Sequence, residues 1–163
     1  MRASERKILI LLSAVQFVNV LDAMMVMPLG PDFAKALGIP MSHLGWIGGS
    51  YTLAGAIMGF LGSFFLDRFD RRSALATAMT GLVVATAAGG FAINLPTLIA
   101  ARMMAGFCGG PAASLTLSII ADVIPIERRG RAIGSVMAAF SVASVLGVPA
   151  GLELSRHGGW RIP

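Results

Sequence analysis

The sequence predicts an all-α integral membrane protein with five transmembrane helices, and two observations support this prediction. Hydrophobic residues make up 56% of the 163 positions and charged residues only 13%, about half the charged share that is usual in soluble domains. A soluble chain of this length has no room to bury so much apolar surface in one core. The apolar residues also form continuous runs rather than alternating with polar ones, which argues against the strands of a membrane barrel.

Five apolar stretches are long enough to cross a hydrocarbon core of about 30 Å, which takes about 20 helical residues. The first follows a basic N-terminus but has no small-residue cleavage site, so we expect a retained helix rather than a signal peptide. The second, third and fifth stretches contain no charged residue. The predicted spans are residues 8–27, 44–66, 73–93, 96–120 and 132–152.

The charges between the spans predict the orientation. Nine basic residues lie in the N-terminal segment and in the second and fourth connections, against three in the other connections and the tail. The positive-inside rule therefore predicts a multi-pass protein with a cytoplasmic N-terminus, and we expect a bacterial inner membrane. This reading leaves no reason to expect a nucleic-acid partner. Cys108 is the only cysteine, and nothing in the sequence predicts a metal site.

Two spans carry glycines four residues apart, a spacing that lets helix backbones approach closely. These pairs are Gly55 with Gly59 in the second span and Gly106 with Gly110 in the fourth. Ordinary helix packing explains either pair alone.

Two charged residues lie inside predicted spans, where an ionisable group is costly and needs a partner. Asp22 lies six residues before Pro28, and Arg102 lies six residues after Pro96. Both positions are at a similar depth on the same side of the membrane. A structural ion pair between two helices is one interpretation. The other is a carboxylate that exchanges protons during transport, because arginine keeps its proton at accessible pH.

The connection between the second and third spans is a short turn with an unusual charge pattern. It contains Asp67, Arg68, Asp70, Arg71 and Arg72. The positive-inside rule accounts for the arginines. It does not account for two aspartates among them.

This turn resembles a signature of the major facilitator superfamily. The segment SFFLDRFDRRSAL is similar to the G-x-L-A-D-R-x-G-R-K-x-x-L motif between helices two and three of that family. Asp67, Arg68, Arg71 and Arg72 match its charged positions, and Asp70 replaces a glycine.

Two further segments resemble the same family in the expected order along the chain. Residues Arg102 to Gly106 are similar to the R-x-x-Q-G element of helix four. The segment Gly147-Val-Pro149-Ala-Gly151 resembles the antiporter motif G-P-x-x-G-G of helix five in drug and sugar efflux members. The resemblance implies helices one to five of an N-terminal six-helix bundle, so residues 1–163 would form an incomplete bundle.

The resemblance also implies roles for individual residues. Asp67 would cap the contact with the C-terminal half of the transporter, which this chain lacks, and Arg71 would pair with Asp122 in a cytoplasmic latch. Asp22 and Arg102 would meet in the central cavity, with Arg102 associated with proton coupling. The glycines and proline of the helix-five motif would bend that helix near the domain interface.

Together these features predict part of a proton-coupled transporter that exports small molecules, such as drugs or sugars, by alternating access. Its partners would be the small-molecule substrate, protons, the lipid bilayer and the C-terminal half, with the proton gradient as energy source and no cofactor. A facilitator or importer of sugars or metabolites is an alternative, as is a truncated protein that does not transport. No catalytic residue and no enzymatic activity are predicted.

Overall fold

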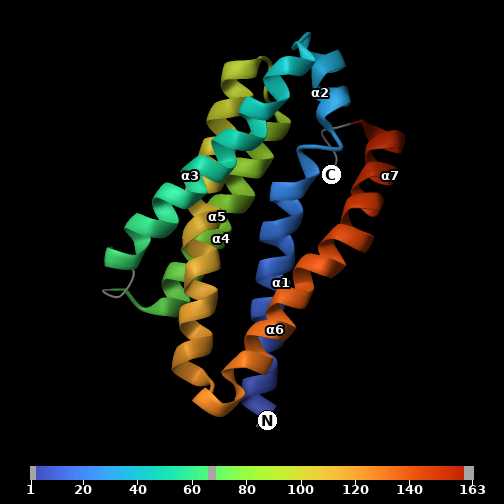
Figure 1. Ribbon diagram of the computed structural model, residues 1–163. Helices are drawn as coiled ribbons and strands as arrows, with labels where there is room; N and C mark the ends of the chain where they lie inside the picture. The colour runs from blue at the N-terminus through green and yellow to red at the C-terminus, as the bar shows by residue number, and fades with distance from the viewer. Residues whose placement is uncertain (1–2, 66–68, 160–163) are drawn as a thin grey trace.

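The computed structural model describes residues 3–65 and 69–159, and within these ranges helices joined by short connections are the only regular secondary structure (Figure 1). Five helical stretches are long and apolar enough to cross a membrane, which confirms the predicted fold class. The elements are α1 (Ala3–Met25), α2 (Gly30–Leu37), the 3-10 turn η1 (Met41–His43), α3 (Leu44–Phe65), α4 (Arg71–Gly90), α5 (Leu95–Val123), α6 (Ile126–Val142), the π-helical turn η3 (Ala143–Gly147) and α7 (Val148–Gly158).

The fifth stretch is longer than predicted, because α6, η3 and α7 together form one stretch from Ile126 to Gly158. The prediction of 132–152 left out both charged ends. Hydropathy marks the part of a helix that lies in hydrocarbon, whereas a helix continues into the interface wherever its charged side chains reach water. For the same reason α1 begins at Ala3 rather than at residue 8.

Helix α2, which lies between the first two spans, was not predicted from the sequence. Proline in its first turn suits a helix start, where a missing N–H costs nothing. Gly38 ends the helix with φ of 63°, a left-handed conformation that glycine adopts without steric cost. Phe33 is buried, so α2 packs one apolar side against the bundle.

The start of α5 is fixed by its own side chains. The Asn94 side chain accepts a hydrogen bond from the Thr97 backbone N–H at 2.9 Å, and the Thr97 hydroxyl accepts one from the Asn94 backbone N–H at 3.2 Å. This reciprocal capping box satisfies two N–H groups that the helix itself leaves unpaired. It sets the position of every residue along α5, including Arg102.

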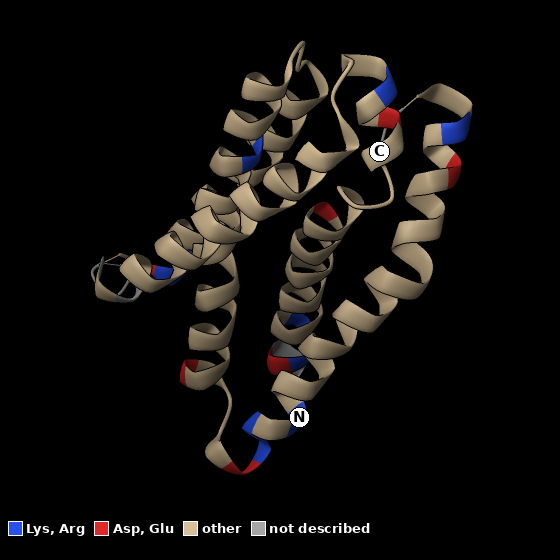
Figure 2. Cartoon of the chain, turned by 45° about the horizontal axis from the view of Figure 1, so that its top comes forward, with Lys and Arg blue, Asp and Glu red and all other residues tan. Residues whose placement is uncertain are grey.

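The helices form two groups (Figure 1). In one group α3 and α4 pack along α5; in the other α1 packs on α6 and η3. Contacts between α1 and α5 join the two groups. Charged residues gather toward the ends of the helices and leave long uncharged stretches between them (Figure 2).

The predicted glycine pairs lie where α3 and α5 touch. A Cβ atom on Gly110 would lie 2.8 Å from the carbonyl carbon of Gly55, and one on Gly106 would lie 3.0 Å from that of Tyr51. Real Cβ atoms do not approach backbone so closely, so these glycines permit direct contact between the two helix backbones.

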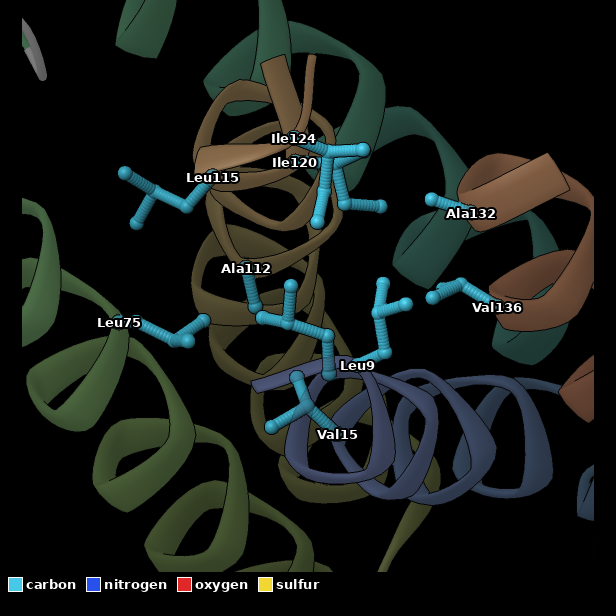
Figure 3. Packing of buried hydrophobic residues seen from close by; sticks show 10 residues of the cluster. Leu9, Val15, Leu75, Ala112, Leu115, Ile120, Ile124, Ala132 and Val136 are labelled. Atoms are coloured by element: carbon cyan, nitrogen blue, oxygen red, sulfur yellow. The ribbon is translucent and has the colours of Figure 1, made fainter. Parts of the chain in front are cut away.

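A buried apolar cluster closes the end of the bundle that holds the N-terminus (Figure 3). It joins α1, α4, α5 and α6, and its members include Leu12, Leu115, Ile120 and Val136, each at most 1% exposed. A second cluster from α1, α2, α3 and α5 closes the opposite end. The candidate site lies on the same helices between these two clusters.

Candidate functional site

Asp22 of α1 and Arg102 of α5 form a two-point ion pair inside the bundle. The Nη1 atom of Arg102 donates to Oδ1 of Asp22, and Nη2 donates to Oδ2, both at 3.0 Å. Nη2 also donates to the backbone oxygen of Asp22 at 2.9 Å. Each side chain is only 9% exposed. Paired hydrogen bonds of this kind fix the orientation of both groups as well as their separation.

A third helix contributes to the same carboxylate. The Thr86 hydroxyl of α4 donates to Oδ1 of Asp22 at 2.8 Å. One oxygen of Asp22 therefore accepts two hydrogen bonds, from α4 and from α5. The charge state of this carboxylate thus bears on the packing of three helices at once.

The other face of Arg102 lies against an aromatic ring and a small polar network. The guanidinium carbon is 4.9 Å from the centre of the Tyr51 ring, within the range of a cation–π contact. The Tyr51 hydroxyl donates to Oδ1 of Asn19 at 2.8 Å, and the Asn19 amide donates to the backbone oxygen of Gly109 at 3.1 Å. This network forms a second polar link between α1 and α5. Within the described part of the chain, the buried Nε of Arg102 has no hydrogen-bond acceptor.

The ion pair lies on the wall of a cavity of about 400 Å³. Asp22, Thr86 and Arg102 provide its polar groups, and the rest of the wall is apolar side chain and glycine. Most pockets that bind small molecules combine an apolar wall with a few placed polar groups in this way. The apolar and glycine lining comes from α1, α2, α4, α5, η3 and α7 and includes Phe17, Val18, Leu21, Phe33, Leu82, Val83, Leu98, Gly147, Gly151 and Leu154.

The structure also brings Arg71 and Asp122 together, as the resemblance implied. Nε of Arg71, at the start of α4, is 2.5 Å from Oδ2 of Asp122, near the end of α5. These side chains are 31% and 52% exposed, so this ion pair is much more exposed than the pair of Asp22 and Arg102. Asp67 and Arg68 lie outside the described residues.

Asp70 caps helix α4, which accounts for one of the aspartates in the charged turn. Its carboxylate accepts hydrogen bonds from the backbone N–H of Ser73 at 2.9 Å and from the Ser73 hydroxyl at 3.0 Å. The Ser73 backbone bond is the main cause that lowers the pKa of Asp70 below its usual value. Asp70 has φ of −58°, so this position does not require the glycine of the family motif.

The motif Gly147-Val-Pro149-Ala-Gly151 lies where helix α6 passes into α7. The Val148 N–H donates to the oxygen of Ala143, five residues back, so the helix widens for one turn before the proline. Such π turns accommodate a break in the regular hydrogen-bond ladder. A Cβ on Gly147 would lie 2.7 Å from Cδ1 of Leu21. Glycine at 147 therefore lets the wide turn lie directly against α1.

Sequence reasoning missed Asn19, Tyr51 and Thr86. Asn19 precedes Asp22 by three residues, which places both on one face of α1, and this spacing was the available signal. Thr86 had no signal of its own. Thr77 and Thr80 on the same helix donate to their own backbone, to the oxygens of Ser73 and Ala76, and nothing in the sequence separates Thr86 from them.

The fold, with five stretches long and apolar enough to cross a membrane, defines a multi-pass membrane protein. The family model described as Major Facilitator Superfamily matches residues 12–163, and the chain belongs to that family. The matched range includes the predicted site residues Arg102, Arg71, Arg72, Asp122, Gly147, Pro149 and Gly151.

Similar proteins agree with this assignment. The chain is 28% identical over 137 residues to the uncharacterized MFS-type transporter YcnB of Bacillus subtilis, covering 84% of this chain and 29% of that protein. It is equally similar, 28% over 137 residues, to a chloramphenicol resistance protein of Streptomyces lividans, of which it covers 35%. The inward-open xylose transporter XylE of E. coli has the same fold, with a TM-score of 0.82 at 20% identity over 96% of this chain and 43% of that one. The chain thus spans about a third of the length of these curated relatives.

Proposed function

We propose that this chain contributes the proton-coupling part of a transporter that exports small apolar compounds by alternating access. The observation that carries the proposal is the buried Asp22–Arg102 pair on the wall of an apolar cavity. The name of the relative from Streptomyces lividans, a chloramphenicol resistance protein, supports efflux. The basic clusters support an N-terminus on the cytoplasmic side of a bacterial inner membrane.

In the proposed mechanism, Asp22 is the group that takes up and releases the proton. Arg102 keeps its charge throughout. Protonation removes the negative charge that holds both terminal nitrogens of Arg102 and leaves that guanidinium buried without its counter-ion. Removing one partner of a buried pair costs about 3–5 kcal/mol.

This cost is large enough to drive a conformational change. Moving a two-state equilibrium from 1:99 to 99:1 takes about 5.5 kcal/mol. The proton on Asp22 would therefore supply most of the bias between two arrangements of α1 against α5. Cargo in the adjoining cavity contacts the same two helices, so cargo and proton act on one equilibrium.

The test uses the longest protein in which this chain occurs, in everted membrane vesicles with an acid interior. We expect Asp22→Asn to abolish chloramphenicol uptake driven by the pH gradient, while Asp22→Glu retains part of it. Glu153→Gln removes an exposed carboxylate on α7 outside the cavity and serves as the matched control. Helical content and membrane yield are measured for every variant.

Gradient-driven uptake by Asp22→Asn at more than half the wild-type rate would overturn the proposed role of Asp22. Uptake in right-side-out vesicles under the opposite gradient would instead indicate import. An absence of transport by well-inserted wild-type protein in both orientations would contradict a transport function for this cargo class.

A further inference from the structure

A second pocket, of about 440 Å³, lies between α1 and α6 at the end of the bundle that holds the N-terminus. None of the residues that line the cavity beside Asp22 and Arg102 lines this second pocket. Its walls are two helical stripes that face each other across the pocket. The α1 stripe is Arg6, Leu9, Ile10 and Ser13, with Glu5 beside it, and the α6 stripe is Arg128, Arg131, Ala132 and Ser135.

The spacing within each stripe explains why these side chains share one pocket. The α1 residues follow the pattern i, i+3, i+4, i+7, and the α6 residues follow the same pattern from Arg128. Positions with this spacing lie on one face of a helix. Each stripe begins with an arginine and ends with a serine, which lies deepest in the bundle. Between them lie Leu9 and Ile10 on α1, and Arg131 and Ala132 on α6.

The mouth of this pocket is strongly positive. Three arginines face one acidic residue, Glu5, and Nη1 of Arg128 is 3.4 Å from Oε2 of Glu5. That distance is longer than a close charge-assisted hydrogen bond of about 2.7–2.9 Å. Arg6 and Arg131 make no ion pair with any residue that the structure describes. Two guanidinium groups thus remain available at the mouth.

The backbone N–H groups in the first turn of α6 add to this positive field, while Glu127 in the same turn opposes it. Pro125 precedes the helix, and no side chain caps it. The N–H groups at a helix start carry partial positive charge and bind anions. Arg128 and Arg131 lie within the first two turns of the same helix. Arginine is the side chain best suited to phosphate, because its planar fork matches two oxygens at once.

We propose that this pocket binds a phosphate group, carried by an anionic phospholipid or by a soluble phosphate compound. Arg6 and Arg131 would hold the phosphate oxygens. The apolar side chains of Leu9, Ile10 and Ala132 and the Ser13 hydroxyl, which also line the pocket, suit the glycerol region of a lipid. The proposed orientation would place the pocket at the cytoplasmic surface, where anionic headgroups lie.

Clustered basic residues at this surface also serve as an orientation signal, so the test must separate binding from topology. The purified full chain in neutral detergent is titrated with phosphatidylglycerol, phosphatidylcholine or inorganic phosphate. Native mass spectrometry gives the apparent Kd of each, and thermal unfolding gives the shift in Tm. We compare wild type with the double variant Arg6→Gln with Arg131→Gln.

Phosphatidylglycerol should bind more tightly than phosphatidylcholine, and the double variant should weaken it about 25-fold. That figure assumes about 1 kcal/mol for each arginine near the surface and tenfold for each 1.4 kcal/mol. Lys7→Gln removes one exposed charge beside Arg6 but outside the pocket, and it should change the Kd less than twofold. Arg131→Lys should restore part of the affinity lost on Arg131→Gln.

The two sources of phosphate give different results. Binding of inorganic phosphate that displaces phosphatidylglycerol indicates a site for phosphate alone, and lipid binding without displacement indicates a headgroup site. Equal affinity for both lipids, or a double variant that binds phosphatidylglycerol within twofold of wild type, would overturn the proposal. Circular dichroism on each variant shows whether a lost signal reflects lost folding.

Discussion

At the scale of single residues, uncharged polar side chains set the geometry of the charged pair. Tyr51 shows this best, because its ring covers the Arg102 guanidinium while its hydroxyl bonds Asn19. Two substitutions distinguish the contribution of the ring from that of the hydroxyl. Phenylalanine removes the hydroxyl only, and leucine removes the aromatic face as well.

Tyr51→Phe should lower the free energy of unfolding by about 0.6 kcal/mol, the average for a hydrogen bond inside a membrane protein. Tyr51→Leu should cost about 2 kcal/mol more, since a desolvated guanidinium also loses its cation–π contact. Unfolding of the chain by SDS in mixed micelles measures both. Equal losses for the two variants would show that the ring face contributes nothing.

Asp70 gives a prediction that depends on pH. Its pKa in the folded protein is lowered by the Ser73 hydrogen bonds, whereas the unfolded value is about 3.9. A lowered folded pKa means that the carboxylate stabilises the fold above the unfolded pKa. This contribution is lost as pH falls through the folded pKa.

Asp70→Ala should therefore be less stable than wild type at neutral pH, and the difference should shrink once the pH falls below about 4. Asp70→Ser keeps a capping oxygen without a charge, so its stability relative to Asp70→Ala should not depend on pH in this range. Thermal unfolding from pH 7 to acid measures the three proteins. A difference between wild type and Asp70→Ala that stays constant with pH would contradict the role of the carboxylate.

At the scale of helices, backbone contact between α3 and α5 determines the packing. A methyl group on Gly110 would have to displace the Gly55 backbone, which cannot rotate away as a side chain can. Gly110→Ala should therefore destabilise the chain by about 1–3 kcal/mol, the usual cost of overpacking.

Gly134→Ala is the matched control on α6, because nothing lies within 4 Å of its added Cβ. Alanine favours a helix over glycine by up to about 1 kcal/mol, so this variant should be neutral or more stable. SDS unfolding compares the two. Similar stability of Gly110→Ala and wild type would mean that the two backbones separate without cost.

Much of this arrangement could be predicted from the sequence, and the limits have physical reasons. Hydropathy located the spans because every span must have enough apolar residues to cross the same hydrocarbon core. The depth of Asp22 and Arg102 anticipated their pairing, since two buried charges of opposite sign at one level satisfy each other. Glycine spacing anticipated close contact but not its partner, because the partner depends on the tertiary fold. Tyr51 and Thr86 gave no signal. In sequence, a threonine that donates to its own helix cannot be distinguished from one that donates to a neighbouring helix.

At the scale of the whole molecule, the pair Arg71–Asp122 ties the start of α4 to the end of α5. An exposed ion pair contributes about 0–1 kcal/mol to stability. Breaking it should change the Tm little, whereas it should change the balance between transporter states that form and break the pair.

Arg71→Asp and Asp122→Arg should each lower transport by the longest protein carrying this chain, and the double exchange should restore it. Uptake in everted vesicles, normalised to the amount of inserted protein, measures all three. Lys7→Asp changes the charge of an exposed residue outside this motif and tests whether net charge alone has the effect. Failure of the double exchange to recover activity, at equal insertion, would contradict the pairing.

The direct backbone contact between α3 and α5 also determines where the bundle can yield. Helices that meet through flexible side chains can shear past one another, because rotamers readjust as the surfaces slide. Gly106 and Gly110 have no side chains that could readjust against α3, so the contact between α3 and α5 is rigid. Between α1 and the other helices lie Leu21 and Met25, whose side chains do readjust. We therefore expect that any motion that opens or closes the cavity would fall to α1 with α6 and α7, and that it would carry Asp22 past Arg102.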